Sequence, residues 1–116
     1  MIFDEKAKRI AEFRAAIADN DQKRQFGLMN LEKLDEQKGM LFLFEKPDII
    51  YMWMKNTLIP LDMIFINGDE IVAIKENAQP LSLDVISSQF SIDKVLEINA
   101  GLVKKYGIKT TQKIRF

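Results

Sequence analysis

The stretch "YMWMKNTLIPLDMIFINGDEIVAI" (51–74) carries the signals that decide the fold. Pro60 disfavours helical backbone at the residue before it, so a bend is expected between two extended segments. Neither segment has a polar face, which predicts that both lie inside a sheet. The pair Asn67-Gly68 before "DEIVAI" predicts a tight β-hairpin, because both residues accept positive φ.

The first twenty residues fit two different patterns. Apolar side chains recur at helical spacing, at Phe3, Ala7, Ile10, Phe13 and Ile17. The segment "EFRAAIA" (12–18), however, alternates as a strand does, and the two interpretations stay open on pattern alone. After it, Asp19 or Asn20 can cap a short helix. Near the other end, "AGLVKKYG" (100–107) predicts a second short helix that stops at Gly107.

Short apolar runs predict the remaining strands, at 39–44, 94–99 and 112–116. Between them, Pro47 and Asp48 predict a turn, and residues 77–92 predict a long loop. The sequence therefore predicts an α+β fold in a single domain over residues 1–116. Its sheet is expected to be mostly antiparallel and barrel-like, with about six or seven strands and two short helices.

The composition excludes several classes of function. Lys plus Arg and Asp plus Glu both number 17, whereas a nucleic-acid-binding domain normally shows a basic excess, so no nucleic acid is expected. The absence of histidine and cysteine excludes a Ser-His-Asp triad, a thiol nucleophile, and imidazole or thiolate metal ligands. No metal or cofactor is therefore expected. No apolar run reaches the roughly 20 residues of a transmembrane segment, and the start lacks the apolar stretch of a signal peptide.

The polar residues inside the central apolar stretch are the main candidates for a site. In a structural interpretation, Asn56 and Thr57 satisfy backbone groups in a turn, and Lys55 pairs with Asp62. In a functional interpretation, Trp53, Lys55, Asn56 and Asp62 line a concave site, where an aromatic wall and a few polar groups bind a small ligand. The residue types alone favour the structural interpretation, because turn chemistry explains their order.

Two further residues are candidates outside this stretch. Arg24 lies on the expected first helix, either on a solvated face or with its guanidinium directed at an anion. Glu97 lies within the apolar strand "VLEIN". Alternation along that strand favours an outward-facing Glu97 over an inward carboxyl group with a raised pKa.

Several motifs occur together in a specific order: "GLMN" (27–30), "GMLFLF" (39–44), "WMKNTLIPLDMIFI" (53–66), "AQP" (78–80) and "VLEINAG" (95–101). They closely resemble the family known as domain of unknown function 192 (uncharacterised protein family 0127), over roughly residues 11–116. The resemblance implies a small, mostly β domain with a barrel-like sheet, and a strand at 12–18 followed by a helix. It implies no activity and no catalytic residues. Because many relatives carry export signals, it also implies a periplasmic or extracellular location.

The chain departs from the family pattern at two places. Asn30 stands where relatives usually have an aromatic or basic residue. Thr111-Gln112 replaces a common Gly-Asp pair, which argues against a role for a carboxylate at that turn.

Three functions are compatible with these observations. The first is a non-enzymatic module that binds a small molecule, a sugar or a peptide through the Trp53–Asp62 segment. The second is an enzyme that uses Lys55 with Asp62 or Glu97 for acid–base chemistry. The third is a structural protein-interaction domain, whose polar cluster only shapes a turn. An exposed Trp53 in a concavity would favour the first, and an extended exposed apolar patch the third.

Overall fold

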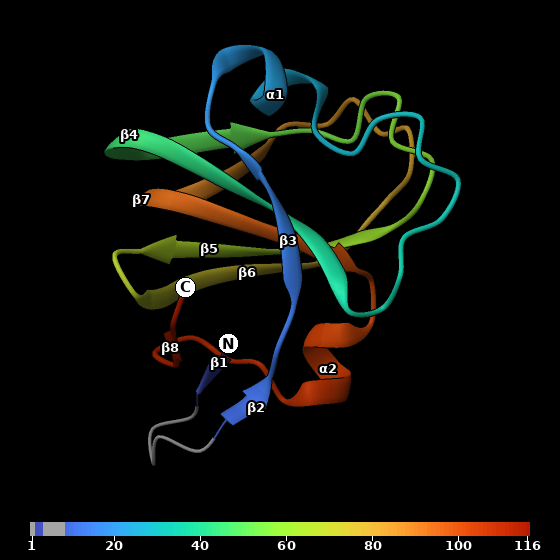
Figure 1. Ribbon diagram of the computed structural model, residues 1–116. Coiled ribbons are helices and arrows are strands. Elements are labelled where there is room, and N and C mark those ends of the chain that lie inside the picture. Colours follow the sequence, from blue (N-terminus) through green and yellow to red (C-terminus); the bar gives the residue numbers. More distant parts are fainter. Residues whose placement is uncertain (1, 4–8) are drawn as a thin grey trace.

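The computed structural model describes residues 2–3 and 9–116. In this part of the chain, eight strands form one sheet, which is accompanied by two short helices (Figure 1). The elements are β1 (Ile2–Phe3), β2 (Arg9–Ala11), β3 (Arg14–Ala18), α1 (Asp21–Phe26), β4 (Lys38–Met52), β5 (Leu61–Asn67), β6 (Glu70–Ala78), β7 (Ile86–Asn99), α2 (Leu102–Tyr106) and β8 (Lys113–Ile114). The strand order is β2-β1-β8-β6-β5-β7-β4-β3. Every described pairing is antiparallel except β3 with β4.

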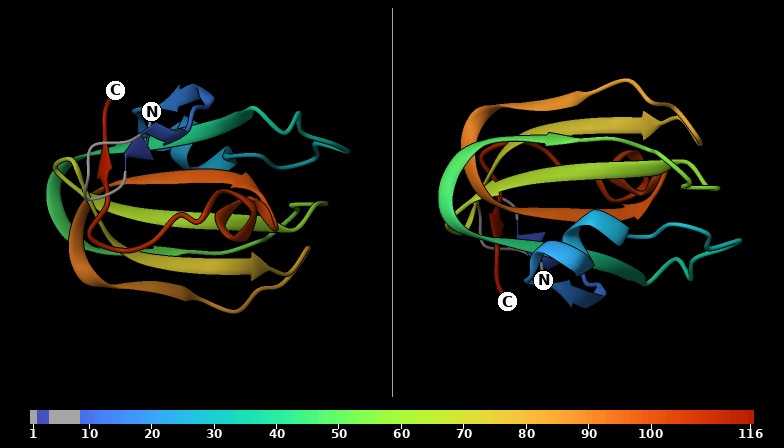
Figure 2. Two further views of the ribbon diagram at one scale, coloured as in Figure 1. Left: turned by 90° about the horizontal axis from the view of Figure 1, so that it is seen from below. Right: turned by 90° about the horizontal axis from the view of Figure 1, so that it is seen from above.

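The sheet curls strongly, because the two longest strands, β4 and β7, bend along their length (Figure 2). The predicted α+β class, with a mostly antiparallel, barrel-like sheet and two short helices, is confirmed. No helix in the described part of the chain combines the length and the apolarity that crossing a membrane requires.

The central strand β5 lies between β6 and β7, and its residues 61–66 are all buried. Its side chains alternate between two cores, as the sequence predicts. Leu61, Met63 and Phe65 enter one core with residues such as Phe42 and Met54. Ile64 and Ile66 enter the other core, together with Leu102 and Val103 of α2. Because both faces are covered, no face of this strand needs polar residues.

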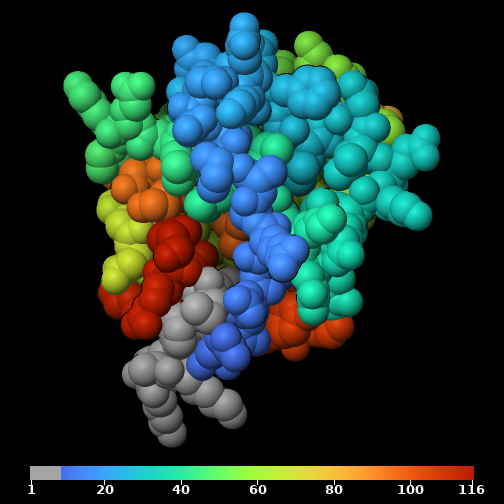
Figure 3. Space-filling model, viewed as in Figure 1, coloured from blue at the N-terminus to red at the C-terminus, as the bar shows by residue number. Residues whose placement is uncertain are grey.

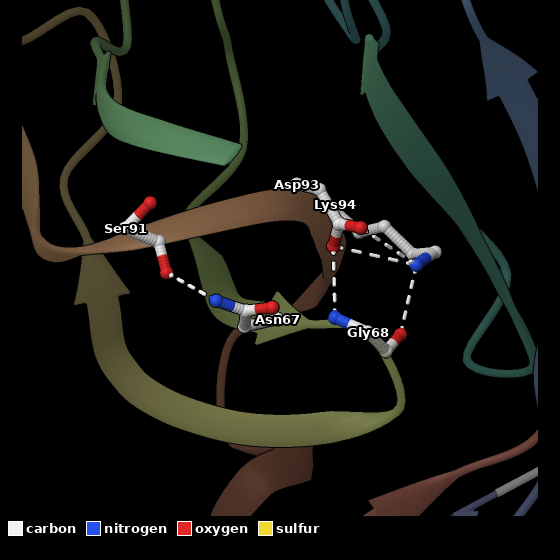
Figure 4. Close-up of polar contacts among 5 residues, drawn as sticks. All are labelled: Asn67, Gly68, Ser91, Asp93 and Lys94. Carbon is white, nitrogen blue, oxygen red and sulfur yellow. Dashed lines mark hydrogen bonds and ion pairs between the residues drawn. The ribbon is translucent and has the colours of Figure 1, made fainter. Parts of the chain in front are cut away.

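The predicted hairpin joins β5 to β6, but its two-residue turn is Gly68-Asp69, because Asn67 is still the last residue of β5 and pairs with Glu70. Of the predicted pair Asn67-Gly68, only Gly68 has a positive φ. Contacts with β7 hold the turn (Figure 4). The Asn67 side-chain amide donates to the carbonyl oxygen of Ser91 at 2.9 Å. The Gly68 amide donates to Asp93 Oδ1 at 3.0 Å, and Lys94 Nζ donates to the Gly68 carbonyl oxygen at 2.8 Å. The turn is therefore fixed against the neighbouring strand as well as by its own conformation.

The two helices follow the predicted start and stop signals. Asn20 caps α1, since its side-chain oxygen accepts a hydrogen bond from the Lys23 amide at 2.8 Å. The helix ends at Gly27, where φ is +52° and an added Cβ would lie 3.3 Å from Cζ of Phe42. A glycine here lets the helix end lie close to the Phe42 ring, which positions α1 against β4. The second helix ends at Gly107.

Three short strands, β1, β2 and β3, account for most of the described residues among the first twenty. The strand predicted at 12–18 is confirmed as β3, which pairs with the first residues of β4. The alternative helical pattern falls partly on residues 1 and 4–8, which lie outside the described residues.

Two predicted interruptions of the sheet are wrong. Strand β4 continues through Pro47 and Asp48, and a shift in its register with β7 replaces the expected turn there. Such a shift tolerates proline, because it breaks the regular ladder in which a backbone N–H would be needed. The expected loop at 77–92 is also shorter, since β7 already begins at Ile86.

Candidate ligand-binding cavity

A cavity of about 230 Å³ lies between α1, the turn at 53–57 and β7. In Figure 3, α1 and the segment after it cover the upper part of the face in view. The apolar lining consists of Phe26, Gly27, Leu28, Met29, Phe42, Phe44, Tyr51, Met52 and Trp53. The polar lining consists of Arg24, Gln25, Thr57, Lys55 and Glu97. The helix, two distant parts of β4 and the middle of the sheet therefore meet at one place.

Glu97 forms the base of this cavity, and its side chain is only 4% exposed. Within the described residues, its carboxyl group has no hydrogen-bond or ion-pair partner. Every fully buried side-chain oxygen in the described residues has a hydrogen-bond partner. Because the carboxyl oxygens of Glu97 have no such partner, they are not fully buried, and they open on the cavity. Burial without a partner raises the pKa of this carboxyl group from 4.5 to about 8, because the charged form is desolvated.

The expectation that Glu97 faces outward is wrong. Its neighbours in β7, Leu96 and Ile98, belong to the core under α2, as alternation requires. The opposite face of β7 is covered as well, since Val95 packs with Phe42 in the second core. Alternation therefore places Glu97 inside the protein, because this strand has no solvent face at that point.

Trp53 and Lys55 form the outer opening of the cavity, which we call its mouth. The Trp53 side chain is 42% exposed, and Lys55 Nζ lies 5.1 Å from the centre of its ring. This is a cation–π contact. In the described chain no carboxylate lies within ion-pair distance of Lys55. A shallower hollow next to the mouth is bordered by the same two residues and by Asn56.

Arg24 links α1 to β4 instead of lying on a solvated face, so the expectation for this residue is wrong. Its guanidinium donates to the Leu43 carbonyl oxygen at 2.6 Å and to Asp21 Oδ1 at 2.9 Å. It also lies 5.4 Å from the centre of the Phe44 ring. With a side chain only 17% exposed, Arg24 holds the helix over the cavity.

The predicted turn chemistry of Asn56 and Thr57 is confirmed. Asn56 has a φ of +54°, which asparagine tolerates better than most residues. The Thr57 hydroxyl donates to the Lys55 carbonyl oxygen at 3.2 Å, and the Thr57 amide donates to the Met54 carbonyl oxygen at 3.0 Å. The Asn30 amide donates to the Asn56 carbonyl oxygen at 2.9 Å. These bonds fix the turn that carries Lys55.

Asp62 lies away from the cavity, so the expected Lys55–Asp62 pair is wrong. The Asp62 side chain is fully buried and accepts three backbone hydrogen bonds. They come from Asn77 at 2.8 Å and from Gly101 and Val103 at 3.0 Å each. Alternation along β5 turns Asp62 towards α2, and its carboxylate joins the start of that helix to the sheet.

The comparison with protein families decides the classification of the chain. The model of DUF192, described as "Uncharacterized ACR", matches residues 2–116. The chain belongs to the DUF192 family.

Two solved structures are similar to this DUF192 protein. A protein from Sinorhizobium meliloti 1021, described as a "putative transcription regulator", is 35% identical with a TM-score of 0.93. The match covers 97% of this chain and 87% of that one. A protein of unknown function from Novosphingobium aromaticivorans DSM 12444 is 34% identical with a TM-score of 0.92, over 99% of this chain and 81% of that one. No curated protein matches this chain.

Most of the predicted site residues of this DUF192 protein gather around the cavity: Arg24, Trp53, Lys55, Thr57 and Glu97 line it, and Asn56 borders the adjoining hollow. No pattern in the sequence distinguishes the apolar residues of the cavity wall, such as Met29, Phe42 and Phe44, from residues of the core. The feature of the sequence that could have identified these wall residues is their position within the family motifs "GLMN" and "GMLFLF". The described residues contain no group of three or more His, Cys, Asp or Glu side chains able to hold a metal ion.

Proposed function

We propose that this DUF192 protein is a non-enzymatic binding module that holds a small ligand in the cavity between α1 and the 53–57 turn. The observation that carries the proposal is Glu97, a largely buried residue whose carboxyl oxygens open on the cavity and have no hydrogen-bond partner among the described residues. Burying a polar group without a hydrogen bond costs free energy, so such groups are rare unless something outside the chain satisfies them.

A second buried carboxyl group in the same sheet shows how the protein treats a structural acid. Asp62 is as deeply buried as Glu97, yet three backbone amides donate to it. The fold therefore provides full hydrogen bonding where a carboxylate serves architecture. The contrast supports a ligand as the missing partner of Glu97.

The size and lining of the cavity support a small ligand. About 230 Å³ exceeds the ~150 Å³ of an apolar protein cavity that holds benzene. It lies below the roughly 300–1,000 Å³ of pockets for drug-sized ligands. A ring-sized body with one or two substituents fits these limits, whereas an oligosaccharide would not. Aromatic walls with a few polar groups at fixed positions are typical of such sites.

The arrangement of the charged residues supports binding over acid–base catalysis. A catalytic pair needs two titratable groups that reach the same reacting atoms. Asp62 faces α2, which removes the Lys55–Asp62 pair. Lys55 and Glu97 both line the cavity, but Lys55 is exposed and contacts the Trp53 ring, whereas Glu97 is buried, so the two groups lie at different depths. The balanced charge of the chain likewise supports a small-molecule ligand over nucleic acid.

Fluorescence of the single tryptophan tests the proposal, because Trp53 lies at the mouth of the cavity. A panel of ring-sized molecules with different charges should contain members that change this fluorescence saturably. The variant Met29→Phe should abolish the change, because a rigid ring in place of the flexible thioether side chain obstructs the cavity at its wall. Ile49→Phe, which adds a ring at an exposed position outside it, should leave binding intact. Binding that survives Met29→Phe, or a panel without any ligand, would refute the proposal.

A further inference from the structure

We propose that the ligand of this cavity is a zwitterion: a ring-sized apolar molecule with an ammonium group at one end and a carboxylate at the other. The inference rests on the proposed function and adds the chemical class of the ligand. The ammonium would contact Glu97 at the base, and the carboxylate would contact Lys55 at the mouth. Three features of the cavity lead to this assignment.

The first feature is the need for a hydrogen-bond donor at the base. Before a ligand binds, the raised pKa keeps Glu97 protonated up to about pH 8, so an ammonium that binds there releases this proton to the solvent. The ammonium then stabilises the resulting carboxylate through a charge-assisted bond, which a neutral donor does not. The two positively charged side chains that line the cavity contact groups other than Glu97. Arg24 is bonded to Asp21 and to the Leu43 carbonyl oxygen, and Lys55 lies on Trp53. An ammonium from outside would therefore meet an acid without a competitor among these side chains.

The second feature is the aromatic wall, which favours cations. Two rings of the lining already hold a cation, since Arg24 lies 5.4 Å from the Phe44 ring and Lys55 lies 5.1 Å from the Trp53 ring. The electron-rich faces of such rings attract positive charge, most strongly where water is excluded. Phe42 forms part of the deeper wall and is almost fully buried. An ammonium near Glu97 would therefore lie against an aromatic wall, which suits a cation better than an aliphatic wall does.

The third feature is the positive charge at the mouth. Lys55 is exposed and has no carboxylate within ion-pair distance in the described chain, and Arg24 adds a second cation to the lining. These charges would repel a simple amine. A carboxylate at the outer end of the ligand turns that repulsion into attraction. A ligand with only a negative charge, in turn, would leave the acid at the base without a partner.

Three probes of nearly the same size distinguish these possibilities: 4-(aminomethyl)benzoate, benzylamine and 4-methylbenzoate. Isothermal titration calorimetry at neutral pH measures their affinities, and Trp53 fluorescence reports whether they enter the cavity. We expect the zwitterion to bind at least about tenfold more tightly than either single-charge probe, a difference of about 1.4 kcal/mol.

Two substitutions assign each charge to its contact. Glu97→Gln should weaken both ammonium-bearing probes about tenfold or more and leave 4-methylbenzoate unaffected. Lys55→Met should weaken both carboxylate-bearing probes and leave benzylamine unaffected or tighter. Lys104→Met, at an exposed lysine of α2 away from the cavity, is the matched control and should change none of the affinities. Circular dichroism confirms that each variant is folded.

The result separates failure of this inference from failure of the proposed function. Equal affinity of wild-type protein for the zwitterion and a single-charge probe would overturn the zwitterion assignment, as would unchanged selectivity in Glu97→Gln. In both cases binding that Met29→Phe abolishes would leave the cavity as a ligand site. If none of the three probes binds, the zwitterion assignment falls, and the broader panel decides whether the cavity binds anything.

Discussion

Replacing Glu97 by glutamine should stabilise the protein at neutral and alkaline pH. The unfolded chain loses this proton near pH 4.5, whereas the folded protein keeps it until about pH 8. Between these values the folded state binds more protons than the unfolded state, so stability falls as pH rises. At 1.36 kcal/mol per pKa unit, the penalty grows to about 3 kcal/mol at pH 7 and about 5 kcal/mol above pH 8. Glutamine has a similar shape but no ionisable proton, so it removes this penalty.

Urea unfolding of both proteins at a series of pH values measures the effect, with Trp53 fluorescence as the signal. The difference in unfolding free energy between variant and wild type should be near zero or slightly unfavourable below pH 4.5. It should then increase steadily in favour of Glu97→Gln up to about pH 8 and stay constant beyond. Taking the difference cancels the titration of the other groups, and Glu76→Gln, at an exposed position of β6, is the control. A difference that does not depend on pH would refute the account of Glu97 as a desolvated, unpartnered acid.

Three further predictions concern the architecture around the site. Asp62→Ala should cost at least about 3 kcal/mol, because three backbone amides lose their acceptor, one of them buried and two partly buried. Lys55→Met should change stability by less than about 1 kcal/mol, and chemical denaturation of the single and double variants should show no coupling between them. Gly39→Ala should cost about 2 kcal/mol or more, because the added Cβ would lie 2.4 Å from the backbone oxygen of Glu97; a thermal melt equal to wild type would contradict this contact. Asn20→Ala should cost about 1 kcal/mol through loss of the α1 cap, and Asn20→Asp should restore most of it in the same assay.

The cavity shows how far sequence reasoning reaches for this protein. The family motifs and the mixture of aromatic and polar residues around Trp53 pointed to a region of the chain that lines the cavity. The partners of Lys55 and Asp62 did not follow from their closeness in sequence. Alternation along β5 directs Asp62 to α2, and the turn directs Lys55 to the mouth of the cavity. Contacts between side chains on different faces of a sheet depend on the fold around them.

The sequence by itself determined the features that depend on local conformational preference. The hairpin turn at Gly68, the cap at Asn20 and the helix end at Gly107 follow from the φ and ψ angles that these residues accept and the backbone groups that they satisfy. The alternation of 61–66 between two apolar faces likewise predicts a strand that is buried on both sides.

Only the tertiary structure decided the environment of Glu97 and Arg24. Periodicity tells which residues share a face of a strand or helix, but what covers that face depends on distant segments. Glu97 is buried because α1 and the bent β4 lie over its side of β7. Arg24 is largely buried because α1 packs on β4, where Arg24 donates to the Leu43 carbonyl oxygen. The raised pKa of Glu97 results from this packing, because desolvation depends on all the atoms around a group and not on its neighbours in sequence.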